Sequence, residues 1–162
     1  MTINPYLTNM VTQVTPQIFI GDSEDARQAI NGDFDSTLNV AIDLDIEDKH
    51  DDIQIRRLRR HKVGLIDGHG NPPLRMVSAL VLLHTIVQSG IKVLVHCQAG
   101  QSRSVMIVAM YCDIAGITPF NEALPKIMEQ RKVQICRSDL YATATFALPI
   151  AKKIVTEYGK EQ

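Results

Sequence analysis

The chain has 162 residues, a formal net charge of −1, 45% hydrophobic residues and 22% charged residues. This composition is ordinary for one globular domain with a single core, and so small a net charge excludes a general attraction for nucleic acid or acidic membranes. The three cysteines form no CxxC pair and leave an odd count, which argues against a disulfide framework and a zinc site.

The beginning of the chain gives no targeting signal. No basic segment followed by an apolar stretch opens the sequence, and no apolar run reaches the length of a membrane span. We therefore expect an intracellular protein, cytoplasmic or nuclear, in a reducing compartment, with no membrane or nucleic-acid partner. The sequence leaves the oligomeric state open.

The first predicted elements are two strands separated by a short helix. Gln17–Gly21 has the composition of a strand, and Asp22–Asp25 provides a cap and early acids for a helix that extends to Ile30. A second strand is expected over Thr37–Ile42 because that stretch is apolar and rich in β-branched residues.

Two blocks of opposite charge follow the second strand. The acidic block comprises Asp43, Asp45, Glu47, Asp48, Asp51 and Asp52, and the basic block comprises Arg56, Arg57, Arg59, Arg60, His61 and Lys62. We favour a solvated loop and edge strand, whose charges neutralise each other, over a docking surface. Ile53 and Ile55 alternate with polar neighbours, so a half-exposed strand is expected to begin there.

A loop and a long helix come next. The apolar piece Val63–Ile66 ends at Asp67–Pro73, where two glycines and a double proline exclude regular structure. Pro73 can begin a helix that continues to Gly90 with apolar residues at helical spacing. His84 faces that apolar stripe, and we interpret it as a hydrogen-bonded core residue.

The last part of the chain is helical after one more strand. Val93–Val95 is the third apolar strand, and a buried helix is expected from Ser102 onward. Further helices are predicted after the Thr118–Pro119 cap, with Pro125 causing a kink or a late start, and after the Ser138–Asp139 cap, with a bend near Pro149. The pattern predicts a single α/β domain in which helices flank a mostly parallel sheet of about five strands.

The most informative stretch joins the third strand to the buried helix. It runs His96-Cys97-Gln98-Ala99-Gly100-Gln101-Ser102-Arg103-Ser104, so a cysteine and an arginine bracket five residues. The unpaired amides and the macrodipole at a helix N-terminus can hold an anion, and Gly100 lets the loop curl so that its amides converge. The same field favours the ionised form of the Cys97 thiol. We predict a phosphate-binding loop that carries its own nucleophile.

The other side chains of this loop fit the same chemistry. Arg103 offers a planar fork of donors to two phosphate oxygens, and the Ser104 hydroxyl can reach back toward the sulfur. The predicted phosphate-binding residues are Gln98, Ala99, Gly100, Gln101, Ser102 and Arg103. No metal or cofactor is needed for this chemistry.

A thiolate that attacks phosphorus also needs an acid to protonate the leaving group. Asp67 is our candidate, because it follows an apolar strand and lies beside glycines that allow its loop to close over a substrate. Asp43 and Asp45 also follow a strand and remain rivals. His69 can share a proton or merely contact solvent.

The loop resembles the signature of the cysteine-based protein phosphatases, and its form HCQAGQSRS is similar to that of the dual-specificity branch. The resemblance extends from about Gln17 to Tyr158, which predicts an N-terminal lead over 1–16, a catalytic domain over 17–158 and a tail over 159–162. Glu122, Ala123 and Arg131 stand where the family has the same residues. The stretch Val133–Cys136 is a weaker match, because a proline is commoner there in the family.

The resemblance implies roles that the residue pattern alone does not. His96 would orient the loop and support the thiolate, Ser104 would assist the departure of Cys97, and an aspartate at about the place of Asp67 would be the acid. The implied activity is hydrolysis of phosphotyrosine, phosphoserine and phosphothreonine in a phosphorylated protein substrate.

Three alternatives remain open. The same chemistry could act on a phosphoinositide or an RNA 5′ phosphate; the basic block supports this faintly, whereas relatives of that kind tend to place lysines where Gln98, Ala99 and Gln101 stand. A phosphopeptide-binding module with little turnover would be expected to lack the nucleophile or the acid. A redox sensor would use the Cys97 thiol alone.

Overall fold

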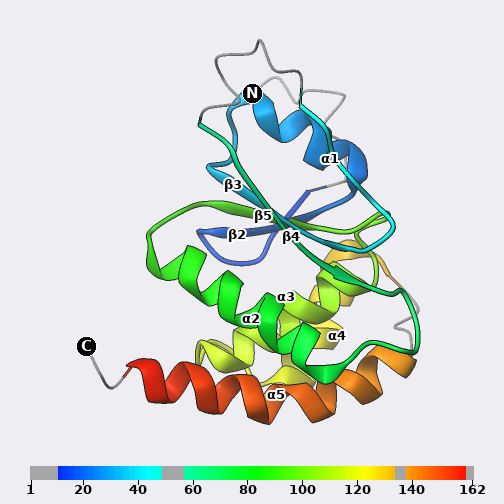
Figure 1. Cartoon of the computed structure of the whole chain (residues 1–162), viewed down its shortest axis with the longest axis vertical. Helices are drawn as coiled ribbons and strands as arrows, with labels where there is room; N and C mark the ends of the chain where they lie inside the picture. Colours follow the sequence, from blue (N-terminus) through cyan, green and yellow to red (C-terminus); the bar gives the residue numbers. More distant parts are fainter. Residues whose placement is uncertain (1–10, 49–56, 134–137, 160–162) are drawn as a thin grey trace.

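A five-stranded sheet with helices on both faces forms the protein (Figure 1). The computed structural model describes residues 11–48, 57–133 and 138–159. The strands are β1 (Thr12–Gln13), β2 (Ile18–Gly21), β3 (Ser36–Ala41), β4 (Arg59–Leu65) and β5 (Val93–His96). The helices are α1 (Ser23–Gln28), the short 3₁₀ helix η1 (Ala29–Asn31), α2 (Pro73–Gln88), α3 (Arg103–Ile114), α4 (Phe120–Arg131) and α5 (Ser138–Gly159).

The sheet topology brings the ends of three parallel strands together. The strand order is β1-β2-β5-β3-β4, with β1 antiparallel and the other four strands parallel. In the register of the sheet, His96 lies opposite Gly21 of β2 on one side and Asn39 of β3 on the other. The residue after His96 therefore emerges at the middle of the carboxyl edge, which is the usual place of a ligand site in such sheets.

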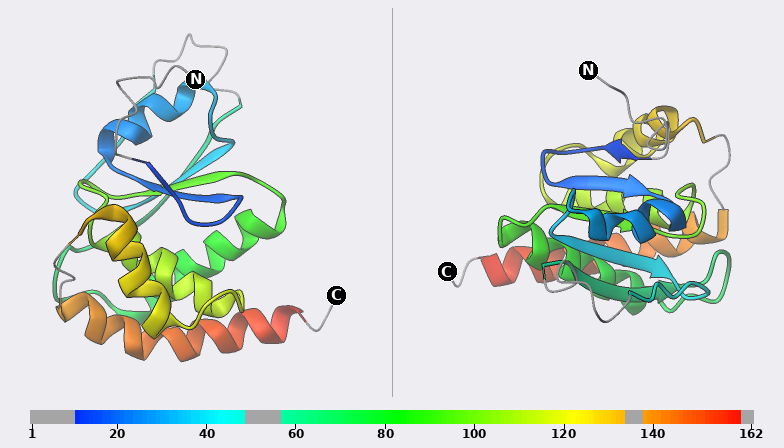
Figure 2. Two further views of the ribbon diagram at one scale, coloured as in Figure 1. Left: turned by 180° about the vertical axis from the view of Figure 1, so that it is seen from behind. Right: turned by 90° about the horizontal axis from the view of Figure 1, so that it is seen from above.

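The helices are distributed unequally over the two faces. α1 lies on one face, whereas α2, α3, α4 and α5 cover the other, as the views in Figures 1 and 2 agree. Ten consecutive residues of α3, 103–112, are buried, so this helix is surrounded by protein. An apolar run long enough for this burial was visible in the sequence, and the prediction of a buried helix is confirmed.

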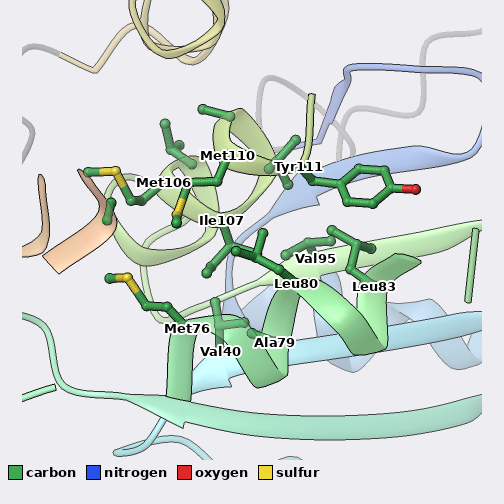
Figure 3. Packing of buried hydrophobic residues seen from close by; sticks show 14 of the residues in the cluster. Val40, Met76, Ala79, Leu80, Leu83, Val95, Met106, Ile107, Met110 and Tyr111 are labelled. Atoms are coloured by element: carbon green, nitrogen blue, oxygen red, sulfur yellow. The ribbon is translucent and has the colours of Figure 1, made fainter. Parts of the chain in front are cut away.

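The core lies between α2, α3 and the sheet (Figure 3). Leu80 and Leu83 of α2 pack toward Val95 of β5 and Ile107 of α3, and none of these four side chains is exposed to solvent. Each leucine buried in this way contributes roughly 1.5–3 kcal/mol to folding. This packing holds α2 and α3 against the sheet.

The structure corrects several predicted boundaries. β4 begins at Arg59, and its polar side chains belong to an edge strand that pairs with β3 alone among the described strands. Ile53 and Ile55, where we expected that strand to begin, lie outside the described residues. α4 begins at Phe120 and includes Pro125, which excludes the late start. The N-terminal lead contributes β1, which the sequence did not suggest.

The charged blocks neutralise each other as expected where they are described. Arg60 forms a salt bridge with Asp48 at 2.5 Å, and Lys62 forms one with Asp45 at 2.6 Å. His84 is partly buried, with its Nδ1 3.2 Å from the Tyr111 hydroxyl, which fits the predicted structural role. None of the helices in the described parts of the chain combines the length and the hydropathy that crossing a membrane requires.

Candidate active site

Cys97 directly follows β5 and lies in the loop that leads into α3. Its side chain is buried, with 2% of its surface exposed. The loop turns at Gly100, whose φ of 65° is in the left-handed region that favours glycine. α3 begins at Arg103, six residues after the cysteine. The strand-to-helix context that the sequence predicted is therefore present, with the thiol at the N-terminal end of a buried helix.

A hydroxyl group lies beside the sulfur. The Cys97 Sγ and the Ser104 Oγ are 3.2 Å apart, and Ser104 is fully buried in the first turn of α3. A serine hydroxyl can donate a hydrogen bond to a sulfur atom at this distance. The predicted contact between Ser104 and Cys97 is thus seen in the structure.

Arg103 is buried next to the same loop. Its side chain is 4% exposed, and its Nη1 donates to the Leu65 carbonyl at 3.0 Å and to the Asp43 carboxylate. The hydrogen bond from Arg103 is the main cause that holds the pKa of Asp43 below its ordinary value. Asp43 therefore lies at the site as an ionised partner of the arginine, which is a poor state for a proton donor.

Asp67 reaches the same cavity from the loop after β4. A cavity of about 210 Å³ is lined by Asp67, Cys97, Gln98, Ala99, Gln101, Ser102 and Arg103. Asp67 itself is exposed. The sequence offered three carboxylates as acids, and of these Asp67 alone lines this cavity. Asp43 contacts Arg103, and the exposed Asp45 pairs with Lys62.

The loop that carries Asp67 is closed by Asn71. The buried Asn71 side chain accepts a hydrogen bond from the Ile66 N–H at 2.7 Å and donates to the Ile66 carbonyl at 2.7 Å. A third bond runs from Asn71 to the Gly68 carbonyl at 3.3 Å. Asn71 fixes the backbone on both sides of Asp67. The sequence showed only that this stretch is a loop, since an asparagine beside prolines signals a turn but not its partners.

His96 directly precedes the nucleophile in sequence and is not among the residues that line the cavity. It is 1% exposed, and its two ring nitrogens have no hydrogen-bond partner within the described residues. Burial lowers the pKa of His96 to about 4, so the ring is neutral at neutral pH. His96 lines a second cavity together with Asn39, Arg60 and Lys62.

The outer side of the loop has partners that the sequence did not reveal. The Ser23 N–H, at the start of α1, donates to the Gln98 carbonyl at 2.9 Å. Arg131, at the end of α4, donates through Nε to the Gly100 carbonyl at 2.8 Å. These contacts link residues far apart in sequence, so no local pattern could have indicated them. Within the described parts of the chain, no group of three or more His, Cys, Asp and Glu side chains could hold a metal ion.

The family of the chain follows from its sequence profile. The family described as "Dual specificity phosphatase, catalytic domain" matches residues 18–144. The chain belongs to this family. The dual specificity phosphatase signature that the sequence suggested is thereby confirmed, together with the α/β fold. No curated protein matches the chain.

Several solved structures have the same fold as this dual specificity phosphatase domain. A mouse putative dual specificity phosphatase complexed with zinc tungstate has a TM-score of 0.74 and 15% identity, over 98% of this chain and 96% of that one. The human tyrosine phosphatase-like serine/threonine/tyrosine-interacting protein has a TM-score of 0.71 and 18% identity, over 88% and 97%. PTPMT1 in complex with PI(5)P has a TM-score of 0.68 and 14% identity, over 92% and 98%. At these identities the likeness shows the fold alone.

Proposed function

We propose that the protein is a cysteine-dependent phosphatase that hydrolyses phosphoric monoesters through a phosphocysteine intermediate. The observation that carries this proposal is the cavity beside the loop, which Cys97, Arg103 and Asp67 line together. A nucleophile, a phosphate-binding cation and a carboxyl group thus face one space, although they come from three separate positions in the sequence. This is the set of groups that phosphoryl transfer from an oxygen to a sulfur requires.

The first step transfers the phosphoryl group to the enzyme. The Cys97 thiolate attacks phosphorus, an S–P bond forms, and the P–O bond to the leaving group breaks. The Asp67 carboxyl donates its proton to the departing oxygen. Arg103 and the loop amides hold the equatorial oxygens of the phosphoryl group as charge shifts between them.

The second step returns the enzyme to its starting state. Asp67, now a carboxylate, takes a proton from a water molecule as that water attacks phosphorus. The S–P bond breaks and inorganic phosphate leaves. The Ser104 hydroxyl, 3.2 Å from the sulfur, donates a hydrogen bond to the thiolate that reforms and so makes it a better leaving group.

The proposed substrates are phosphotyrosine, phosphoserine and phosphothreonine in proteins. Arg103 is the one basic side chain among the residues that line the cavity. A cavity with one basic side chain suits a substrate with a single phosphoryl group better than an inositol ring that carries several phosphates. The fold likeness to PTPMT1 in complex with PI(5)P makes phosphoinositides the comparison that the experiment must include.

The experiment measures phosphate release from a panel of substrates in the presence of a chelator. The panel contains phosphotyrosine and phosphoserine peptides, a phosphoinositide, a 5′-phosphorylated RNA and p-nitrophenyl phosphate. We expect hydrolysis of the peptides and of p-nitrophenyl phosphate, and complete loss of both in Cys97→Ser, because a serine hydroxyl stays protonated where a thiol ionises.

The matched control is Cys112→Ser, which changes a buried cysteine of α3 that does not line the cavity. This variant should keep its activity. If the phosphoinositide or the RNA is hydrolysed in preference to the peptides, that class of molecule is the substrate and phosphorylated protein is not. Peptide binding without turnover would instead make the protein a phosphopeptide-binding module.

A further inference from the structure

The carbonyl groups on the outer side of the phosphate loop need hydrogen-bond donors. A loop whose N–H groups converge on an anion turns carbonyl groups away from it, and a carbonyl left without a partner there costs free energy. Two of these carbonyls have partners outside the loop, namely the Gln98 carbonyl, bound by the Ser23 N–H, and the Gly100 carbonyl, bound by Arg131. The first partner is backbone, and the second is a side chain that mutation can change.

Arg131 joins the loop to two strands of the sheet. Its Nε donates to the Gly100 carbonyl at 2.8 Å, and its Nη1 donates to the Ile20 carbonyl of β2 at 3.1 Å. Nη1 is also 3.3 Å from the Thr12 hydroxyl of β1. The rigid guanidinium therefore holds the Gly100 carbonyl at a fixed distance from the edge of the sheet.

The contact at Gly100 is also a close steric fit. A Cβ atom added to Gly100 would lie 2.3 Å from Nη2 of Arg131 and 2.6 Å from the carbonyl oxygen of Gly21. The loop is therefore confined between the end of β2 and the guanidinium plane. The arginine touches loop backbone and does not line the cavity where the substrate phosphate would bind.

The charge of Arg131 is balanced from the other side. Burial lowers the pKa of Arg131, whereas the nearby Asp25 and Asp22 carboxylates favour its charged form. Asp25 is 7% exposed and accepts a hydrogen bond from the Asp22 N–H at 2.9 Å. These carboxylates offset part of the cost of burying the guanidinium group.

We propose that Arg131 is a positioning residue of the phosphate loop: by holding the Gly100 carbonyl outward, it aims the loop amides at the phosphoryl group. It acts through the loop backbone and touches neither the substrate nor the reacting sulfur. The inference rests on the proposed function only in that the loop binds a tetrahedral oxyanion.

The test is the variant Arg131→Lys, which keeps the positive charge and removes the planar fork. Sulfate is the probe, because its charge is constant between pH 5 and 8. Iodoacetamide alkylates Cys97, and peptide mass spectrometry follows the rate of this reaction. The measured quantity is the sulfate concentration that halves the rate. The reaction is run at a temperature where thermal melts show that the protein is folded. The matched control is Arg27→Lys, an exposed arginine of α1 that pairs with Glu24.

Arg131→Lys should raise the half-protecting sulfate concentration about tenfold, the effect of losing one hydrogen bond to a charged group, and Arg27→Lys should leave it unchanged. Protection of Arg131→Lys at the wild-type concentration would overturn the proposal, since a purely structural role would lower the melting temperature and spare the affinity. If Arg131→Lys does not fold, the proposal is tested by NMR on the unaltered protein, through the resonance of the Arg131 Nε–H group. Sulfate should shift that resonance, and an unmoved resonance would overturn the proposal.

This experiment is independent of turnover. A protein that hydrolyses no phosphoric monoester, yet loses sulfate affinity in Arg131→Lys, would refute the proposed function and leave the role of Arg131 intact. If the wild type hydrolyses the peptides and Arg131→Lys keeps its sulfate affinity, the proposed function is supported and the role of Arg131 is refuted.

Discussion

Two aspartates near the nucleophile have different surroundings, and this difference assigns them different roles. Asp67 is exposed and lines the cavity, whereas Asp43 is bound to Arg103. Replacing Asp67 by Asn removes a proton donor of the same size. We expect a loss of about 10²- to 10⁴-fold on phosphoserine, whose alkoxide is a poor leaving group. The loss on p-nitrophenyl phosphate, whose phenolate leaves readily, should be much smaller, and steady-state kinetics on the two substrates compares them.

An equal loss on both substrates would show that Asp67 acts in binding or folding and not as the acid. The variant Asp45→Asn serves as the control, because Asp45 is 80% exposed, pairs with Lys62 and does not line the cavity. It should leave both rates unchanged.

Asp43→Asn should behave differently from Asp67→Asn. The arginine that binds Asp43 keeps its pKa low, so Asp43 is ionised throughout the neutral range and cannot donate a proton. Its loss should weaken the orientation of Arg103 and lower kcat/KM about tenfold for phosphoserine and p-nitrophenyl phosphate alike. A loss confined to the poor leaving group would make Asp43 the acid and contradict the assignment of Asp67.

The residue types at the site could be predicted, but their pairing could not. Cys97, Arg103 and Ser104 share one local signature, so their proximity follows from sequence spacing. Asp43 and Asp67 both follow a strand and are equivalent by that rule. The hydrogen bond that separates their roles joins Asp43 to a residue sixty positions away, and no local pattern reports such a contact.

At the scale of single elements, α1 begins with a capping box in which one carboxyl group is buried. Asp22 and Asp25 each accept a hydrogen bond from the backbone N–H of the other. Burial is the main cause that raises the pKa of Asp25 from 3.8 to about 6. Above that pH the folded protein must keep a buried charge that costs free energy, on the order of 1–3 kcal/mol.

The variant Asp25→Asn should therefore stabilise the fold at pH 8, because the amide oxygen can still accept the Asp22 N–H. The sign follows from proton uptake: a carboxyl whose pKa is raised in the folded state binds more protons when folded, so its penalty disappears as the pH falls from 6 toward 4. Urea unfolding at pH 8 and pH 4 measures the difference, with the exposed Glu24→Gln as control. A variant less stable than the wild type at both pH values would contradict this reading.

The elements themselves were predictable where their patterns were strong. α2, α3, β3 and β5 follow from apolar runs and caps, because tertiary packing agrees with local preference there. β1 and the start of β4 did not follow, since their polar residues owe their extended conformation to pairing with a neighbouring strand. Pro125 indicated a kink or a late start of α4, and the helix begins earlier, at Phe120, and includes the proline.

For the whole molecule, stability and catalysis should be separable. Leu80→Ala removes a fully buried side chain from the core between α2 and the sheet. We expect a loss of about 2–5 kcal/mol in the free energy of unfolding, measured with urea. Because Leu80 does not line the cavity, kcat should be unchanged at a temperature where the variant is folded. Leu74→Ala on the same helix is the control, since Leu74 is 65% exposed and its loss should cost little.

A large fall in kcat of folded Leu80→Ala would mean that core packing sets the geometry of the phosphate loop over a long distance. The position of Cys97 would then depend on the whole core, not on the loop and its immediate partners.

The measurement that tests the account most directly is detection of the phosphocysteine. The variant Ser104→Ala should form the intermediate normally and release it slowly, because the sulfur loses the hydrogen bond of its neighbour. After mixing with p-nitrophenyl phosphate and quenching in acid, mass spectrometry should find one phosphoryl group on the peptide that contains Cys97, preceded by a burst of p-nitrophenol. Turnover with no phosphoryl group on Cys97, or with the group on another residue, would contradict the covalent mechanism.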